Sequence, residues 1–189
     1  PEFIEKPLKM LKNGLKYYIK ENKLPQNTAI FYLVVNSGST DEREGEQGLA
    51  HFLEHMAFNG SRDFSKNELI KQLESLGVKF GADLNAQTSY DQTSYTLSIN
   101  VNEKNLKDVF KVFSNWIDGV KIDAGELDKE RGVIMEEERQ RNTPAYRLYL
   151  AQSKDIFAGS IYQKREPIGD MNVIKSVDAK HMQEFYERL

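Results

Sequence analysis

The 189 residues, 39% hydrophobic and 29% charged, suffice for one domain with a hydrophobic core and have neither the low hydrophobicity nor the repeats of a disordered chain. A net charge of -3 gives no basic field that would attract a nucleic acid, and no apolar run approaches the roughly 18 residues that span a bilayer. The chain has no cysteine, which excludes disulfides and a cysteine nucleophile, so any metal must be held by histidine and carboxylate side chains.

The first hundred residues alternate between strand-like and helical patterns. Runs of β-branched and aromatic residues bounded by turn residues predict strands, whereas segment 49–58 is apolar on almost every side, as a buried helix is. A capping box of Ser65 and Glu68 begins an amphipathic helix that Gly77 ends. The predicted strands are 15–20, 29–37, 78–87 and 93–101, with the last two joined as a hairpin near residues 89–92.

The second half of the chain is predicted to be mostly helical. Apolar residues recur at helical spacing over 103–118, a cap signal at Asp123 begins a long helix to about Arg141, and Pro144 separates it from a helix to Phe157. The stretch 159–177 resembles a loop, and 178–189 a terminal helix. Strands in hairpins with separate runs of helix predict an α+β fold, with helices covering an antiparallel or mixed sheet.

Two histidines and a glutamate stand out in the predicted buried helix. His51 and His55 are four residues apart, so they share one helix face and can direct ring nitrogens at the same ion. Glu54 lies between them, where it can meet a metal-bound water as a general base without being a ligand. The histidines could instead be ordinary hydrogen-bonded core residues. Unpaired polar groups in so apolar a helix would, however, each cost several kcal/mol, and a bound cation would compensate them.

A catalytic zinc ion takes three protein ligands and leaves a fourth position for water, so a third ligand must lie elsewhere. The remaining histidine, His181, is expected to be structural, because a lone histidine in an amphipathic helix usually is. The acidic run on the long helix offers Glu130, Glu136, Glu137 and Glu138. At about 100° per residue, Glu130 and Glu137 fall within roughly 20° of each other, so a ligand and its supporting acid could share that face. The other two point elsewhere and are expected to be solvated.

The order His51-x-x-Glu54-His55 is the inverse of the common zinc-peptidase motif. The similarity extends well beyond it, to 37–39, 48–50, 56–60, 81–88, Thr93, Tyr95 and 130–137. Together these stretches resemble the pitrilysin family, which includes insulin-degrading enzyme and the mitochondrial processing peptidase. Within that family, segments 13–18 and 48–60 are most similar to the large bacterial zinc proteases described as PqqL-like.

The resemblance implies a zinc metalloendopeptidase that hydrolyses peptides or unfolded protein segments. It implies one Zn²⁺ per chain, bound by His51, His55 and Glu137, with Glu54 as the base and Glu130 supporting the site without binding the ion.

The resemblance also implies that segment 84–88 is an edge strand beside the metal, to which an extended substrate adds by backbone hydrogen bonds. Asn85 and Ala86 are the substrate contacts expected there. Without the resemblance, an ordinary strand followed by a turn would be the better interpretation.

Members of the family enclose their substrate between two homologous halves, and a second half is missing here. The start, Pro1-Glu2-Phe3, lacks an initiator Met, and the terminal helix stops without a cap. We therefore expect residues 1–189 to be one N-terminal catalytic domain of a larger peptidase, completed by its C-terminal half or a partner subunit. The alternatives are a non-catalytic zinc-stabilised interaction or scaffold domain, against which Glu54 argues, and a half-enzyme inactive by itself. Resemblance to secreted bacterial members favours the periplasm.

Overall fold

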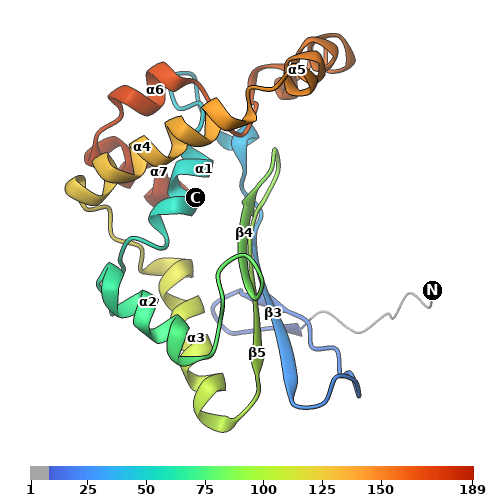
Figure 1. Ribbon diagram of the computed structural model, residues 1–189, viewed down its shortest axis with the longest axis vertical. Helices are drawn as coiled ribbons and strands as arrows, with labels where there is room; N and C mark the ends of the chain where they lie inside the picture. Colours follow the sequence, from blue (N-terminus) through green and yellow to red (C-terminus); the bar gives the residue numbers. More distant parts are fainter. Residues whose placement is uncertain (1–8) are drawn as a thin grey trace.

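Helices cover one face of a small antiparallel sheet (Figure 1). The computed structural model describes residues 9–189, so the expectation drawn from Pro1-Glu2-Phe3 lies outside the described residues. The predicted α+β fold is confirmed. In chain order the elements are β1 (Lys9–Met10), β2 (Lys16–Tyr17), β3 (Thr28–Val35), the 3₁₀ turn η1 (Ser39–Asp41), α1 (Leu49–Met56), α2 (Lys66–Ser75), β4 (Leu84–Thr88), β5 (Thr93–Asn100), α3 (Glu103–Asp118), α4 (Ala124–Arg141), α5 (Pro144–Ile156), the 3₁₀ turn η2 (Ile161–Lys164), α6 (Met171–Ser176) and α7 (Ala179–Arg188).

The larger sheet has the order β3-β5-β4, with both pairs antiparallel. Tyr95 on the central strand lies opposite Leu33 on one side and Ala86 on the other. Because side chains alternate between the faces of a strand, this row points at the helices. Ile30 and Tyr32 of β3 lie on the opposite face and are exposed. The predicted hairpin is confirmed: β4 and β5 are joined by residues 89–92.

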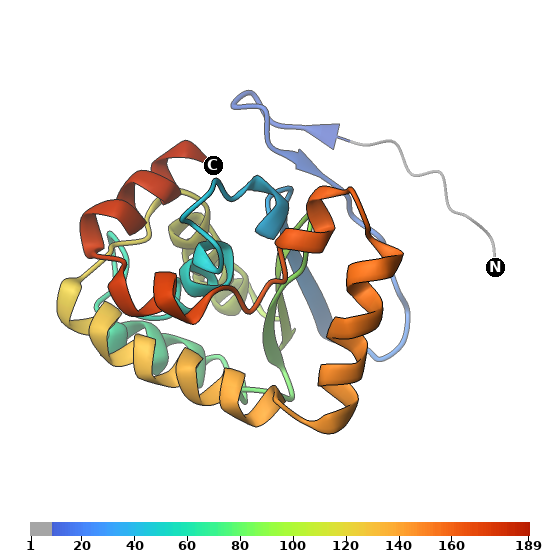
Figure 2. The ribbon, with the colours of Figure 1, turned by 90° about the horizontal axis from the view of Figure 1, so that it is seen from above.

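The core lies between this sheet and the helices. Trp116 of α3 stacks on Tyr95 at a ring-centroid distance of 5.1 Å, and its Nε1 donates a hydrogen bond of 3.0 Å to the main-chain oxygen of Ala57. Phe52 and Met56 of α1 are fully buried. Seen from above, α1 lies near the middle of the molecule, with α4, α6 and α7 around it (Figure 2). This position explains why the α1 sequence is apolar on nearly every side.

Helix α4 crosses α1 and turns one defined face toward it. Leu127 and Ile134 on that face are almost completely buried. Glu130 and Glu137 fall on the same side at helical spacing, three residues after each of them. Apolar burial therefore fixes the rotation of α4 so that these two glutamates point at α1.

Three predicted boundaries differ from the structure. Strand β4 begins at Leu84 instead of residue 78, because residues 79–83 form a turn in which the Asp83 N–H donates to the Lys79 carbonyl at 2.8 Å. The strand predicted at 15–20 is reduced to the short β2, which pairs with β1. The segment 159–177, predicted as a loop, contains η2 and α6. Helix α6 has six residues and only one fully buried side chain, Ile174, so it gives almost no periodic signal.

The N-terminal end of α1 is capped from outside the helix. Gly48 is the N-cap residue, has φ of +99°, and offers no side chain to cap the helix. The buried carboxylate of Glu42 replaces it, since its Oε1 accepts a hydrogen bond of 2.9 Å from the Ala50 N–H. A negatively charged carboxylate at this position also interacts favourably with the positive end of the helix dipole.

The segment 165–170 fastens this end of α1 from far along the chain. Arg165 Nε donates to the Glu42 carbonyl at 3.0 Å, and Asp170 N–H donates to the Gln47 carbonyl at 3.2 Å. Gly169 lies so close to Gly48 that a Cβ atom on it would overlap the Gly48 backbone. The start of the helix is thus fixed by main-chain contacts on both sides.

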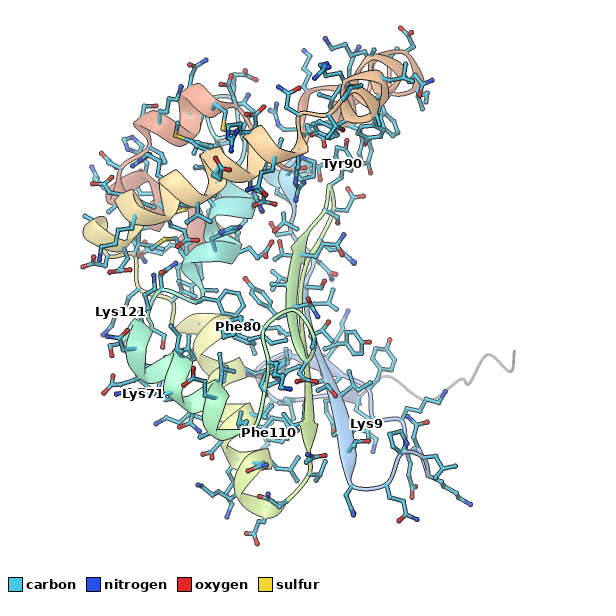
Figure 3. All side chains as sticks on the ribbon, viewed as in Figure 1. Lys9, Lys71, Phe80, Tyr90, Phe110 and Lys121 are labelled. Atoms are coloured by element: carbon cyan, nitrogen blue, oxygen red, sulfur yellow. The ribbon has the colours of Figure 1, made fainter. Side chains whose placement is uncertain are left out.

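Helix α5 is attached at the tip of the hairpin. Tyr90 at that tip lies beside α5 (Figure 3), and its hydroxyl donates to Glu166 Oε2 at 2.7 Å. Tyr146 of α5 donates to the other oxygen of the same carboxylate at 3.1 Å. Within residues 9–189, no helix is long and apolar enough to cross a membrane.

Candidate metal centre

His51, His55 and Glu137 meet where α4 crosses α1. The two histidine Nε2 atoms are 3.2 Å apart, and Glu137 Oε2 lies 3.5 Å from that of His51 and 3.6 Å from that of His55. Ligands at roughly 2.0–2.2 Å from a tetrahedral zinc ion are roughly 3.3–3.6 Å from one another. The three atoms therefore stand at the separations that a metal ion of this kind requires, although they come from helices about eighty positions apart in the sequence.

Glu130 orients the second histidine from behind. His55 Nδ1 lies 2.8 Å from Glu130 Oε1, so it donates its proton there and leaves Nε2 free to face the other two groups. Asn59 completes this arrangement, since its Nδ2 donates to Glu130 Oε2 at 3.0 Å and to the His55 carbonyl at 2.9 Å. Asn59 falls in the family-like segment 56–60, but no role at the site was predicted for it from the sequence. Its spacing of four residues from His55 is the signal that could have placed it at the site.

His51 is held differently. Its ring is buried, and its Nδ1 has no hydrogen-bond partner among the described residues. Its ring lies edge-on to that of His55, with centroids 4.7 Å apart. The orientation of the His51 ring is therefore determined by the side chains packed around it, and not by a hydrogen bond to Nδ1.

Electrostatics separate the two histidines. Burial and the neighbouring His55 lower the pKa of His51 to about 4. Burial acts in the same direction on His55, but the carboxylates of Glu130 and Glu137 outweigh it and raise the pKa of His55 to about 9. The hydrogen bond with His55 in turn lowers the pKa of Glu137 to about 2. At neutral pH the site therefore has a neutral His51 beside a protonated His55 paired with carboxylates.

Glu54 lies on the same helix but does not join the group of possible ligands found within residues 9–189. It is buried, and its Oε2 accepts a hydrogen bond of 2.7 Å from Thr88 Oγ1 at the end of β4. Burial raises the pKa of the Glu54 carboxyl, and the Thr88 hydroxyl opposes that shift. A carboxylate with a raised pKa beside a metal site has the properties of a general base. The sequence did not single out Thr88 for this contact.

Strand β4 is an edge of the sheet among the described residues, since its only neighbour is β5. Hydrogen bonds of 2.8 Å run from Ser98 N–H to the Asp83 carbonyl and from Ser89 N–H to the Gln92 carbonyl. Because bonded and non-bonded pairs alternate in an antiparallel ladder, residue 85 bonds to β5, and residue 86 turns its main-chain groups to the open edge. Ala86 thus offers its backbone on the same strand as Thr88, which contacts Glu54, whereas the exposed side chain of Asn85 belongs to the opposite face.

The remaining acidic and histidine candidates lie away from the site. Glu136 is exposed and paired with Arg139 at 2.6 Å. His181 is exposed in α7, where its Nδ1 lies 2.7 Å from Asp178 Oδ1. Neither belongs to the group that could hold a metal ion.

Comparison with known proteins agrees with this geometry. The sequence profile of the insulinase family (peptidase family M16) matches residues 17–159. The chain belongs to this family. The relationship predicted from the sequence motifs is therefore confirmed, and with it the predicted fold class.

Several M16 relatives match nearly the whole chain. The probable zinc protease PqqL of Haemophilus influenzae is 41% identical over 179 residues, which are 94% of this chain and 19% of that protein. The chloroplastic stromal processing peptidase of Arabidopsis thaliana is 33% identical over 185 residues, 94% of this chain and 14% of that protein. The crystal structure of the periplasmic protease PqqL from Escherichia coli has a TM-score of 0.93 at 37% identity, covering 96% of this chain and 20% of that one. The chain thus spans about a fifth of the length of its PqqL relatives.

Proposed function

We propose that this chain is the metal-bearing domain of a zinc metalloendopeptidase. The observation that supports this best is the cluster of His51, His55 and Glu137 ligand atoms at 3.2–3.6 Å from one another. Two histidines and one glutamate form the ligand set of several catalytic zinc peptidases. One zinc ion per chain fits these distances, and PqqL relatives are named zinc proteases.

In this proposal each residue has one role. When bound, zinc polarises a peptide carbonyl and lowers the pKa of water toward roughly 7. Glu54 accepts the proton of the attacking water and returns it to the leaving amine, for which a raised pKa is suited. Glu130 keeps the proton of His55 on Nδ1, so that Nε2 stays available to the ion.

The proposed substrate is an extended peptide or an unfolded protein segment. It would add to the open edge of β4, where Ala86 offers its main-chain groups next to the end of the strand that contacts Glu54. Asn85 would contact the substrate through its exposed side chain, or act by holding β4 in register with β5.

The complete enzyme is proposed to include a second, homologous half that closes over the substrate. The long PqqL relatives support this, since the chain corresponds to about a fifth of each. The same relatives support a periplasmic location, because the E. coli protease is described as periplasmic.

A non-catalytic scaffold remains the rival function. The same fold occurs in a peptidase M16 inactive domain from Pseudomonas fluorescens, at a TM-score of 0.80 and 17% identity, so the fold alone does not establish catalysis. The buried Glu54 beside the ligand cluster favours catalysis, because a scaffold has no need of a buried acid there.

A comparison of zinc content and peptide cleavage tests the proposal. Glu54→Gln should keep about one zinc per chain and lose cleavage by about three orders of magnitude or more. His55→Ala should lose both. Glu136→Gln removes the same charge from an exposed position of α4 and should behave as wild type. Zinc binding with equal cleavage by wild type and Glu54→Gln would refute the role of Glu54, and zinc binding without cleavage by the complete protein would favour the scaffold.

A further inference from the structure

Arg141, at the C-terminal end of α4, contacts one oxygen of the Glu137 carboxylate. Its Nη2 donates to Glu137 Oε1 at 2.5 Å. The other oxygen, Oε2, faces the Nε2 atoms of His51 and His55. The two oxygens of this carboxylate therefore have separate partners, a guanidinium on one side and the imidazoles on the other.

The contact is favourable in its helical setting. Glu137 and Arg141 are four residues apart with the acid nearer the N-terminus, which is the better order for such a pair. A cation in the last turn of a helix also interacts well with the helix dipole. The pair should therefore persist when an ion binds to Oε2.

We propose that Arg141 is a positioning residue of the metal centre, which holds Glu137 so that only Oε2 is presented to the ion. This inference rests on the proposed zinc site. A carboxylate free to rotate can bind a metal with both oxygens and occupy the position that a catalytic zinc keeps for water. A carboxylate with Oε1 bound by a guanidinium cannot do so without breaking that bond.

An ordinary surface ion pair is the simpler explanation, and the same helix provides the comparison. Arg139 pairs with Glu136 at 2.6 Å, with side chains 75% and 46% exposed, against 46% and 29% for Arg141 and Glu137. Pairs as exposed as the first contribute little. The two arginines lie two residues apart, so Arg139→Ala is a matched control for the loss of charge and side chain from this end of α4.

The test is zinc affinity, measured by competition with a chromophoric chelator, together with kcat and KM on a peptide at saturating zinc. Arg141→Ala should weaken zinc binding by roughly 10- to 100-fold, as loss of a partner of a metal ligand does. It should also lower kcat more than it raises KM. Arg141→Lys should recover part of the affinity, because lysine supplies the charge but not the planar fork of donors. Arg139→Ala should match wild type.

Suppose that wild type binds zinc and cleaves peptide, and that Arg141→Ala and Arg139→Ala have equal zinc affinity and kcat. This result would overturn the role of Arg141 and leave the proposed function intact. A wild type that binds no zinc would overturn both. Thermal unfolding of each metal-free variant separates positioning from stability, since positioning requires that Arg141→Ala keep the unfolding temperature of Arg139→Ala.

Discussion

Zinc binding to the metal-free protein is expected to release one proton from His55. The pKa of His55 is raised to about 9, because the carboxylates of Glu130 and Glu137 outweigh burial. Its Nδ1 proton stays with Glu130, at 2.8 Å, so the proton that an ion must displace is the one on Nε2. His51, with a pKa of about 4, has no such proton to lose near neutral pH.

The size of the effect follows from these values. At pH 7, below the pKa of His55 of about 9, protonation should weaken the apparent zinc affinity by about 100-fold. The affinity should rise about tenfold per pH unit and level off near pH 9. The stability of the metal-free protein should change in the opposite direction. The folded-state pKa of His55 lies above its ordinary value, so its contribution is fully present below about pH 6.5 and is lost as the pH rises through about 9.

Isothermal titration calorimetry at pH 7, in two buffers of different ionisation enthalpy, counts the released protons directly. A value near one is expected for wild type. Glu130→Gln replaces the carboxylate that helps raise the His55 pKa, so it should release fewer protons and show a shallower dependence of affinity on pH. Zinc binding with no proton release, and an affinity that is constant between pH 6.5 and 9, would refute this account of the site.

Three further substitutions test other contacts. Gly169→Ala should destabilise the protein in urea by at least about 2 kcal/mol more than Gly159→Ala. Both glycines are left-handed, at φ of +82° and +78°, but only the first has backbone where a Cβ would lie. Glu42→Ala removes the cap of α1 and should cost roughly 1–2 kcal/mol in the same assay, whereas Glu42→Gln retains an acceptor and should cost less. Thr88→Val removes the hydroxyl that lowers the Glu54 pKa, so the acid limb of kcat/KM should move to higher pH; Thr88→Ser should leave it in place.

The sequence predicts most of the elements because their signals are local. The capping box of α2 and the cap at Asp123 are observed as expected, and the helix 103–118 has the predicted limits. Helix periodicity alone also places Glu130 and Glu137 on one face of α4. The segments that were predicted wrongly have weak patterns in the sequence: α6 is too short to show a period, and the turn at 79–83 is stabilised by its own backbone hydrogen bonds, which side-chain patterns do not reveal.

The contacts that support the site could not be predicted from the sequence. Asn59 and Thr88 reach Glu130 and Glu54 across 71 and 34 residues, distances at which sequence patterns say nothing about contact. Arg141 is only four residues from Glu137, but an arginine at that spacing on an acidic helix normally predicts a solvated ion pair. What distinguishes the Arg141–Glu137 pair from an ordinary surface pair is that Glu137 Oε2 faces the two histidines.

The contacts between segment 165–170 and the start of α1 have a consequence for the order of events in folding. Ser39 Oγ donates to the Arg165 carbonyl at 2.5 Å, and Arg165 Nε donates to the Glu42 carbonyl, so these bonds close loops of 126 and 123 residues. Such long-range contacts form late because loop closure must come first. A nascent chain extended as far as α4 already contains both histidines and Glu137, yet lacks the segment that fixes the start of their helix. Acquisition of the ion should therefore follow synthesis of segment 165–170, because a shorter chain would hold the ligands in a loose site.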